Sequence, residues 1–433
     1  MNNTSTVLQQ LKQGLFDPLF VTLYGKNAVE SQRIRYIKAV QDFTAIYGEK
    51  ENLRLFSAPG RTEIGGNHTD HNHGCVLAAS VNLDVIAVAA ATDDGRIRIQ
   101  SEGYAMDTVE IADTSVHQEE INRSSSLIRG TAARFAQLGF GVGGFDAFTT
   151  SNVLKGSGLS SSAAFEVLVG TMLNGFYNNG EVDAVTIAKV AQYAENVYFG
   201  KPCGLMDQMA SSVGGIITID FTSTDAPIIE TVDFDFAESG HRLCIVDVGG
   251  SHADLTYEYA AVPSEMKQVA HELGVDVLRE TDFDALFANV PTLREKLGDR
   301  AVLRAMHFFA ENERVIKQVA ALRGRDFEIF KQLVIESGHS SFEYLQNIYA
   351  NCDVSFQGVS LALALAQRVL DKKGAWRVHG GGFGGTIQAF VPDELVDEFS
   401  ATLCAVFGKQ HCHILSIRPC GGIELTKEIL QPR

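Results

Sequence analysis

A short run of glycine and serine holds the residues of this 433-residue sequence best suited to binding an anion. The segment Gly156–Ala164 follows an expected strand and opens an apolar helix. Its glycines allow close backbone approach, and hydroxyls at a helix N-terminus join free N–H groups that attract anions. It is neither a Walker A loop nor a dinucleotide-binding turn. A helix cap needs one serine, not three behind two glycines, so a phosphate site is favoured over a serine cap. The residues expected to hold phosphate are Gly156, Ser157, Gly158, Leu159, Ser160, Ser161 and Ser162.

A second glycine cluster, Gly380–Gly385, follows Arg377 and His379. Five glycines among six residues lose much conformational entropy on folding, more than a plain turn requires. We expect the backbone here to approach a ligand or the first glycine loop closely. The alternative is a flexible turn between a helix and the strand that begins at 386.

The segment Gly60–Gly74 is unusually polar for a stretch between two strands. It carries His68, Asp70, His71 and His73, whose spacing fits no standard zinc pattern. Side chains that both donate and accept hydrogen bonds suit sugar hydroxyls, so the segment favours a polyol ligand over a metal.

Two acidic residues further along leave two interpretations open. Asp207 follows Met206 in a glycine-containing turn, where it could cap a helix or act as a general base towards a hydroxyl. Glu195 interrupts an otherwise apolar helix face, where it could be a surface acid or a ligand for Mg²⁺.

The composition excludes several classes of protein. A net charge of -17 and the lack of a long basic run argue against nucleic-acid binding. Seven cysteines without a CxxC pair indicate free thiols in a reducing compartment. No signal peptide or membrane span is indicated. We therefore expect a soluble cytoplasmic protein.

The elements that must position these residues mix helices and strands without strict alternation, which favours an α+β fold. Residues 1 to about 50 read as helical, and Leu53–Pro59 as a strand. Leu83–Ala91 and Arg96–Gln100 flank Asp93-Asp94-Gly95, which is a hairpin pattern. A boundary within 221–232 divides the chain into two predicted domains, 1–225 and 226–433.

Taken together, these segments resemble the GHMP small-molecule kinase family, and within it the galactokinases. The family has a sugar signature, a serine-rich phosphate loop and a C-terminal glycine motif, matched here by Gly60–His71, Lys155–Ala164 and Gly374–Gly385. Phe199–Gln208 and Ala310–Val315 resemble two further galactokinase segments.

This resemblance implies a two-domain fold with the active site in the cleft between the domains. The implied reaction is ATP-dependent phosphorylation of the anomeric hydroxyl of galactose, giving galactose 1-phosphate, by a monomeric enzyme with Mg²⁺. The loop 156–162 would hold the ATP phosphates, Arg61 would lie beside the transferring phosphate, and Asp207 would accept or orient the hydroxyl proton. Ser162 and Glu195 match the Mg²⁺ ligands. The positions that match sugar-binding residues are Asn67, His68, Asp70, Gly204 and Tyr259.

The sequence departs from the family pattern at several positions near the expected sugar. Asn67 stands where the family has glutamate, and Glu63 where it has asparagine. His71 replaces a tyrosine and His379 a threonine. A kinase for a galactose derivative altered at C6 or C2 is therefore an alternative. A non-catalytic sugar sensor is disfavoured, because the serine loop is intact.

Overall fold

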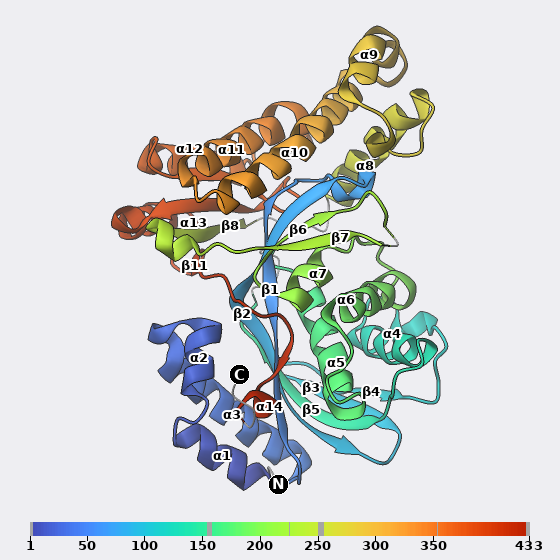
Figure 1. Ribbon diagram of the computed structural model, residues 1–433, viewed down its shortest axis with the longest axis vertical. Coiled ribbons are helices and arrows are strands. Elements are labelled where there is room, and N and C mark those ends of the chain that lie inside the picture. Colours follow the sequence, from blue (N-terminus) through green and yellow to red (C-terminus); the bar gives the residue numbers. More distant parts are fainter. Residues whose placement is uncertain (1–2, 154–157, 225, 250–254, 353, 430–433) are drawn as a thin grey trace.

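Two β-sheets and their covering helices form the computed structural model, which describes residues 3–153, 158–224, 226–249, 255–352 and 354–429 (Figure 1). The larger sheet has eight strands and the smaller has four. Figure 1 shows the helices of the second half above the smaller sheet and the first helices of the chain at the opposite end.

The larger sheet is built around the long strand β2 (Cys75–Thr92), which pairs antiparallel with β1 (Arg54–Gly65) along most of its length. The other edge of β2 is shared, because its first residues pair with β6 and its last residues with β5. The sheet is completed by β3 (Arg96–Ser101), β4 (Asp107–Glu110), β5 (Gly144–Ser151), β6 (Ile216–Asp220), β7 (Ile228–Val232) and β12 (Ile423–Glu424).

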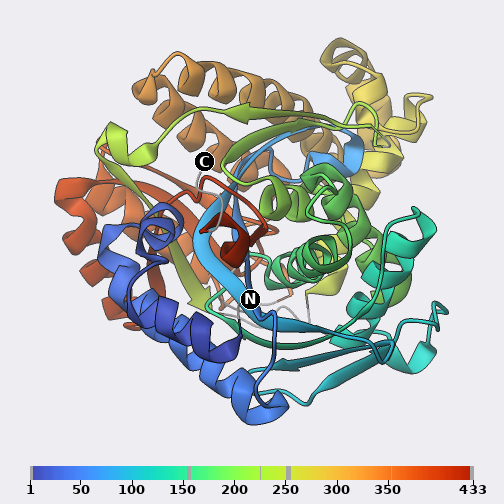
Figure 2. The ribbon, with the colours of Figure 1, turned by 60° about the horizontal axis from the view of Figure 1, so that its bottom comes forward.

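Both faces of this sheet are buried. Successive residues of β2 point to opposite faces, and both sets of side chains are apolar. Ile86 and Val88 pack into one apolar cluster, whereas Val85 and Ala87 pack into another. Helices α1 (Thr4–Lys12), α2 (Asp17–Tyr24) and α3 (Val29–Tyr47) contribute to the first cluster. The second cluster includes residues of α4 (Ser124–Gln137), α5 (Ser161–Tyr177) and α6 (Ala184–Tyr193). Helix α7 (Met206–Val213) packs on β1 and β2 and shares a separate cluster with Val76 and Ala78 (Figure 2).

The smaller sheet runs in the order β11 (Cys412–Leu415), β8 (His241–Gly249), β10 (Gly385–Pro392) and β9 (Ala375–His379). Helices α12 (Gly358–Leu370) and α13 (Val396–Phe407) share one apolar cluster with it, and α11 (Phe327–Ser340) packs against β9. A separate bundle contains α8 (Thr256–Glu272), α9 (Phe283–Leu297) and α10 (Asp299–Arg323). The last helix is α14 (Leu425–Glu428).

Short helical turns connect these elements. Two wide turns of π type continue α6 and α11, at Ala194–Phe199 and Ser341–Leu345. The 3-10 turns are Lys26–Ala28, Asp70–Asn72, Gln118–Glu120, Phe236–Ser239, Leu278–Glu280 and Asp393–Leu395.

The expected hairpin around Asp93-Asp94-Gly95 is wrong. β2 and β3 follow each other in the chain, but β5 lies between them in the sheet, antiparallel to β2 and parallel to β3. The sequence Asp93-Asp94-Gly95 correctly predicts that β3 runs opposite to β2. It carries no information on whether a later strand enters between the two arms.

The division at residue 225 stays a prediction, and the sheets bear on where a boundary could fall. Residue 225 lies between β6 and β7, which pair with each other in the larger sheet. The C-terminal strand β12 also returns to this sheet, beside β1. A division that respects both sheets would therefore follow β7 and return residues 423–428 to the first unit.

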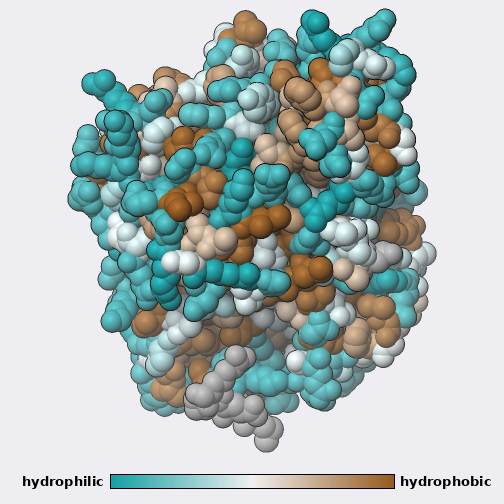
Figure 3. Space-filling view, turned by 45° about the horizontal axis from the view of Figure 1, so that its top comes forward, coloured by the Kyte–Doolittle hydropathy of each residue, from teal (hydrophilic) through white to brown (hydrophobic). Residues whose placement is uncertain are grey.

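The state of the cysteines and the polarity of the surface can be compared with what the composition predicts. All seven cysteines are free thiols. Among the described residues, no helix is both long and apolar enough to cross a membrane. The face shown in Figure 3 is mostly hydrophilic, with apolar side chains in scattered groups.

Candidate active site

A pocket of about 290 Å³ lies where three distant parts of the chain meet, and we call it the Asp207 pocket. Its walls come from the end of β1 and the segment after it, from the turn that leads into α7, and from the glycine loop after β9. It therefore joins the two halves of the molecule. The predicted residues that line it are Arg61, Asn67, His68, Asp70, Gly204 and Asp207.

Arg61 and Asp207 form an ion pair at the centre of this pocket. Nε of Arg61 lies 2.6 Å from Oδ1 of Asp207, and the Ser160 hydroxyl donates to Oδ2 at 2.6 Å. The Arg61 guanidinium also donates to the carbonyl of Gly158. The carboxylate is thus fixed from both sides, by a strand residue and by the serine loop.

The environment favours the charged form of Asp207. Burial alone would raise the pKa of its carboxyl group. The charge of Arg61 and the hydrogen bonds from Arg61 and Ser160 outweigh burial, so the pKa lies below its ordinary value. Asp207 itself lies in the first turn of α7.

Ser160 precedes α5 in a left-handed backbone conformation, with φ of 55°. The Ser160 side chain makes no capping bond and binds Asp207 instead, so the alternative of a plain serine cap is not what this residue forms. Non-glycine residues in this conformation are uncommon and concentrate at functional sites. Among the described residues, no side chain caps the N-terminus of α5. Gly156 and Ser157 of the predicted loop lie outside the described residues.

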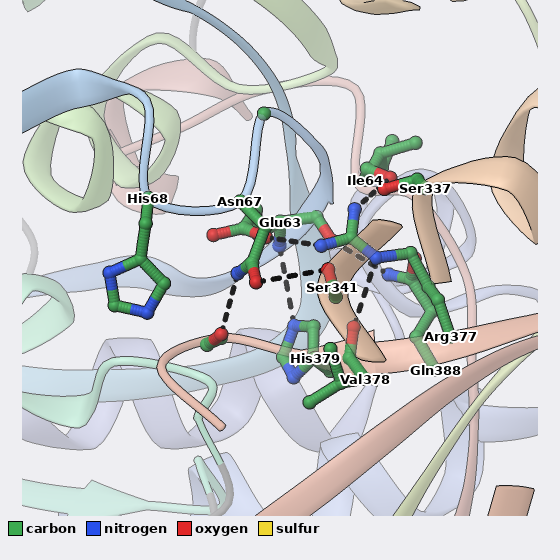
Figure 4. A network of polar contacts seen from close by, with 12 residues as sticks. Glu63, Ile64, Asn67, His68, Ser337, Ser341, Arg377, Val378, His379 and Gln388 are labelled. Carbon is green, nitrogen blue, oxygen red and sulfur yellow. Dashed lines mark hydrogen bonds and ion pairs between the residues drawn. The ribbon is translucent and has the colours of Figure 1, made fainter. Parts of the chain in front are cut away.

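Asn67 is the most heavily bonded residue of the pocket. Its amide nitrogen donates to Oε1 of Glu63 at 3.0 Å and to the carbonyl of Gly380 at 2.7 Å. Its amide oxygen accepts from Asn347 at 2.8 Å and from Ser341 at 3.4 Å. These contacts come from both halves of the chain (Figure 4). Asn67 therefore ties the two halves together.

The other predicted sugar-binding residues differ in position. His68 lines the pocket and contacts the carbonyl of Gly381 through Nε2 at 3.0 Å. A Cβ atom on Gly204 would lie 2.3 Å from Oδ2 of Asp70, so a larger residue would push Asp70 aside. Tyr259 donates to the carbonyl of Gly382 at 2.8 Å and packs on Phe383, outside the lining of the pocket.

The C-terminal glycine cluster approaches both the pocket and the first loop, as expected. Gly380 and Gly381 line the pocket. Gly382 has φ of 81°, and a Cβ atom there would lie 2.0 Å from the carbonyl oxygen of Asn347. A Cβ atom on Gly158 would contact His379 at 3.1 Å. Only glycine fits the Gly382 position, which explains one of the five glycines physically.

A buried pair of carboxylates lies behind Asp207. The Gln208 amide donates to Oε2 of Glu195 at 2.7 Å and to Oε2 of Glu166 at 3.2 Å. Nζ of Lys201 lies 3.4 Å from Oε1 of Glu195. Oε1 of Glu166 is buried and has no hydrogen-bond partner among the described residues. Glu166 lies one helical turn after Ser162 in α5, on the same face.

A second pocket of about 520 Å³, the Phe165 pocket, opens beside the serine loop. Asn152 and Val153 line it before the loop and Ser161 after it. Tyr104 and Phe165 give it aromatic surface, and the hydroxyl-bearing residues of β5 give it polar groups. Sequence reasoning missed this pocket, because its residues come from five helices and strands whose meeting no local pattern encodes.

Three more functional candidates were missed for different reasons. Glu63 was noted only as a departure from the signature, although it lines the Asp207 pocket. Lys201 carries a charge at the pocket and is paired with Glu195. Glu166 was assigned to an apolar helix, where a lone buried acid was itself the available signal.

Known proteins share both the sequence motifs and this fold. The GHMP kinases N terminal domain matches residues 126–215, and the galactokinase galactose-binding signature matches residues 41–91. The chain is 30% identical to a galactokinase of Bacillus subtilis over 82% of this chain and 90% of that protein. It is 32% identical to a galactokinase of Streptomyces coelicolor over 82% of this chain and 88% of that protein.

Solved structures support the same assignment at the level of the fold. A galactokinase of Lactococcus lactis, crystallised with galactose, superposes with a TM-score of 0.77 at 22% identity, covering 90% of this chain and 100% of that one. A mevalonate kinase superposes with a TM-score of 0.58 at 15% identity, over 84% and 98% of the two chains. The α+β architecture of two packed sheets is thus that of the GHMP kinases, and this chain is a phosphotransferase of the galactokinase family.

Proposed function

We propose that the protein transfers the γ-phosphoryl group of ATP to the anomeric hydroxyl of galactose, giving galactose 1-phosphate and ADP. The observation that carries this proposal is the Arg61–Asp207 ion pair in a pocket beside the serine loop. Galactose is proposed as the sugar because the relatives are named galactokinases. The pocket supplies hydroxyl-binding side chains and a carboxylate where the reacting hydroxyl would lie.

The two charged side chains have separate tasks in this reaction. Asp207 is ionised and accepts or orients the proton of the anomeric hydroxyl as its oxygen bonds to phosphorus. The bond between the γ-phosphorus and the bridging oxygen breaks, and ADP leaves. Arg61 holds Asp207 in place and brings positive charge to the transferring group. Phosphoryl transfer depends mostly on such positioning and charge neutralisation.

The ATP would span the two pockets. The N-terminus of α5 and the described loop residues Gly158–Ser162 are suited to the phosphates. The Phe165 pocket offers aromatic and aliphatic surface for the base and hydroxyl groups for the ribose. Gly156 and Ser157 complete the proposed phosphate loop.

The carboxylate pair fits a hard cation. Glu166 and Glu195 share a single amide donor, and one Glu166 oxygen has no described partner, so the site has uncompensated acceptor capacity. Carboxylate and hydroxyl oxygens are the ligands Mg²⁺ prefers. We assign Glu195 and Ser162 as its ligands, with Glu166 behind them. Bound Mg²⁺ would neutralise phosphate charge in a protein of net charge -17.

The proposal extends to a cytoplasmic location and a monomeric enzyme. A cytoplasmic location fits seven free thiols. A monomer fits the scattered apolar groups on the face in Figure 3. Light scattering of the purified protein would measure its oligomeric state.

One assay tests the proposed reaction. Purified protein with ATP and Mg²⁺ is offered galactose, glucose, 2-deoxygalactose and galacturonate, and ADP release is measured together with the phosphorylated product by NMR. We expect galactose to react fastest and the phosphate to appear on the anomeric oxygen. Faster turnover of a C6- or C2-altered sugar would assign the protein to that substrate instead. ADP release from none of them would overturn the kinase assignment.

A further inference from the structure

Glu63 and Asn67 line the Asp207 pocket together with the reacting groups. Asn67 would be the expected sugar contact from its place in the signature. Its side-chain amide can donate two hydrogen bonds and accept two. It donates to Glu63 and Gly380 and accepts from Asn347 and Ser341, so all four positions are used. Asn67 therefore has no hydrogen-bonding capacity left for a ligand.

Glu63 differs from Asn67 in the use of its side chain. Both described hydrogen bonds to its carboxylate, from Asn67 and from Nη2 of Arg377 at 2.7 Å, end on Oε1. Oε2 receives none of the hydrogen bonds found in the described part of the chain. Because Glu63 lines the pocket, this second oxygen is the one a ligand can reach.

The strand sets the place of Glu63 relative to the reacting groups. Arg61 and Glu63 are two residues apart in β1, where they pair in regular register with Ser80 and Ala78. Alternate residues of a strand share a face, so both side chains point to the same side, about 7 Å apart along the strand. A sugar whose reacting hydroxyl meets Asp207 would extend past Arg61 towards Glu63.

Arg377 fixes the carboxylate in this position. Its side chain is completely buried, and it also donates to the carbonyls of Ile64 and Val378 at 2.8 and 2.9 Å. Figure 4 shows Arg377 and Asn67 converging on Glu63. A guanidinium held by backbone carbonyls cannot follow a ligand, so it holds the Glu63 carboxylate at one place on the pocket wall.

From these contacts we propose that Glu63 is the residue that determines sugar specificity at the far end of the pocket, accepting a hydrogen bond from a ring or exocyclic hydroxyl distant from the reacting one. The inference rests on the proposed sugar kinase function and adds the recognition group. Relative to the signature, asparagine and glutamate have exchanged positions. The direct Glu63–Asn67 bond shows how an exchange can keep one carboxylate and one amide on the wall.

This assignment has a chemical consequence for the substrate. A carboxylate accepts a hydrogen bond from a hydroxyl, and a charge-assisted bond is about twice as strong as a neutral one. It repels a carboxylate at the same place. The pocket should therefore select neutral sugars that carry a hydroxyl there and reject the corresponding acid sugar.

The decisive experiment pairs Glu63→Gln with a set of deoxygenated sugars. KM and kcat are measured for wild type and variant with galactose and with 2-, 3-, 4- and 6-deoxygalactose. We expect Glu63→Gln to raise KM for galactose about tenfold with little change in kcat. The penalty should disappear for the one deoxy sugar that lacks the partner hydroxyl. Glu230→Gln, an exposed acid outside the pocket, is the matched control.

An equal penalty on galactose and all four deoxy sugars, or no penalty on any, would overturn the assignment of Glu63. A second test exchanges the pair. Glu63→Asn and Asn67→Glu should each lower kcat/KM by about tenfold or more, and the double variant should recover most of the loss. A double variant as poor as the product of the two single effects contradicts the exchange.

Failure of the kinase assignment would look different. In that case wild-type protein releases no ADP with galactose, whatever stands at position 63. The same sugars are then measured by titration calorimetry without ATP. A loss of affinity in Glu63→Gln that vanishes for one deoxy sugar would still support Glu63 as the recognition group, and a uniform result would overturn it.

Discussion

Asp84 and Glu63 are both buried carboxylates paired with arginine, but their surroundings give them opposite properties. Burial alone would raise the pKa of both groups. At Asp84 two arginines, Arg35 and Arg418, outweigh burial, and the pKa is lowered. At Glu63 burial outweighs Arg377 and the more distant Arg61, and the pKa is raised. The hydrogen bonds from Ser57 and Tyr24 also lower the pKa of Asp84, whereas Asp70 adds to the rise at Glu63.

The two sites also differ in how completely the carboxylate is used. Asp84 accepts bonds from Arg35 at 2.6 Å, from Tyr24 at 2.6 Å and from Arg418 at 3.1 Å, and also from Ser57, with both oxygens engaged. It is fully buried and lines neither pocket of the site. Glu63 keeps one oxygen at a pocket wall. A saturated carboxylate holds the fold together, whereas one with a spare oxygen can serve a ligand.

The largest effect expected from this comparison is on stability, at Asp84. Asp84→Asn leaves the buried Arg418 and the partly buried Arg35 without their counter-ion and should lower the free energy of unfolding by about 3–5 kcal/mol. KM for galactose should stay unchanged in the protein that remains folded. Chemical denaturation measures the first quantity and steady-state kinetics the second. Asp94→Asn, which removes a surface partner of Arg98, should change stability by less than about 1 kcal/mol.

The converse test removes a pocket carboxylate. Asp207→Asn should lower kcat about 100-fold or more, the scale of general-base loss, while ATP binding stays near that of wild type. Isothermal titration with a nonhydrolysable ATP analogue separates the two effects. Unchanged turnover would exclude Asp207 as the base.

Variants of the proposed Mg²⁺ ligands should give a smaller effect, on the Mg²⁺ dependence of the rate. Glu195→Gln and Ser162→Ala should each raise the Mg²⁺ concentration for half-maximal rate, by about tenfold, because each removes one hard oxygen ligand. The exposed acid Glu181 offers a matched control as Glu181→Gln. Magnesium titrations that superpose on wild type for both variants would contradict the ligand assignment.

The smallest expected effect is that of the buried histidines on how the free energy of unfolding changes with pH. Burial is the main cause that lowers the pKa of His307 and His379. Both groups take up a proton on unfolding below about pH 6.5, so their contribution to stability is complete above that pH and falls as the pH drops. The loss is about 1.4 kcal/mol per pH unit for each histidine.

Replacing one of these histidines should remove its share of the pH dependence. His379→Gln should flatten the fall in unfolding free energy between pH 6.5 and 5.5 by about 1 kcal/mol. Denaturant unfolding at the two pH values measures it. The exposed His339→Gln should leave the slope unchanged. A wild-type protein equally stable at both values would contradict the prediction.

Much of the site was predictable because its residues lie in short local motifs. The loop 156–162 was marked by its glycines and serines and Asp207 by a glycine-containing turn, whereas the role of Arg61 came from the family resemblance. Their roles stay predictions, although the structure brings Arg61, Ser160 and Asp207 into contact.

The rest depended on distant contacts. The capacity of Asn67 is consumed by Asn347 and Ser341, almost 300 positions away, which no local pattern contains. The insertion of β5 between β2 and β3 is likewise a property of the whole sheet. Burial and hydrogen-bond saturation therefore had to come from the structure.

The return of the C-terminus to the first sheet has a consequence for the order of events at the ribosome. Arg418, Ile423 and Leu425 all dock against residues near β1 and β2, and Arg418 lies 334 positions after its partner Asp84. At about 5–20 residues per second, translation needs roughly 20–60 s between those two codons. During that time the nascent first half carries Asp84 with Arg35 alone. A stop codon before Arg418 would leave that half permanently in this unfinished state, and we expect such a chain to be captured by chaperones or degraded.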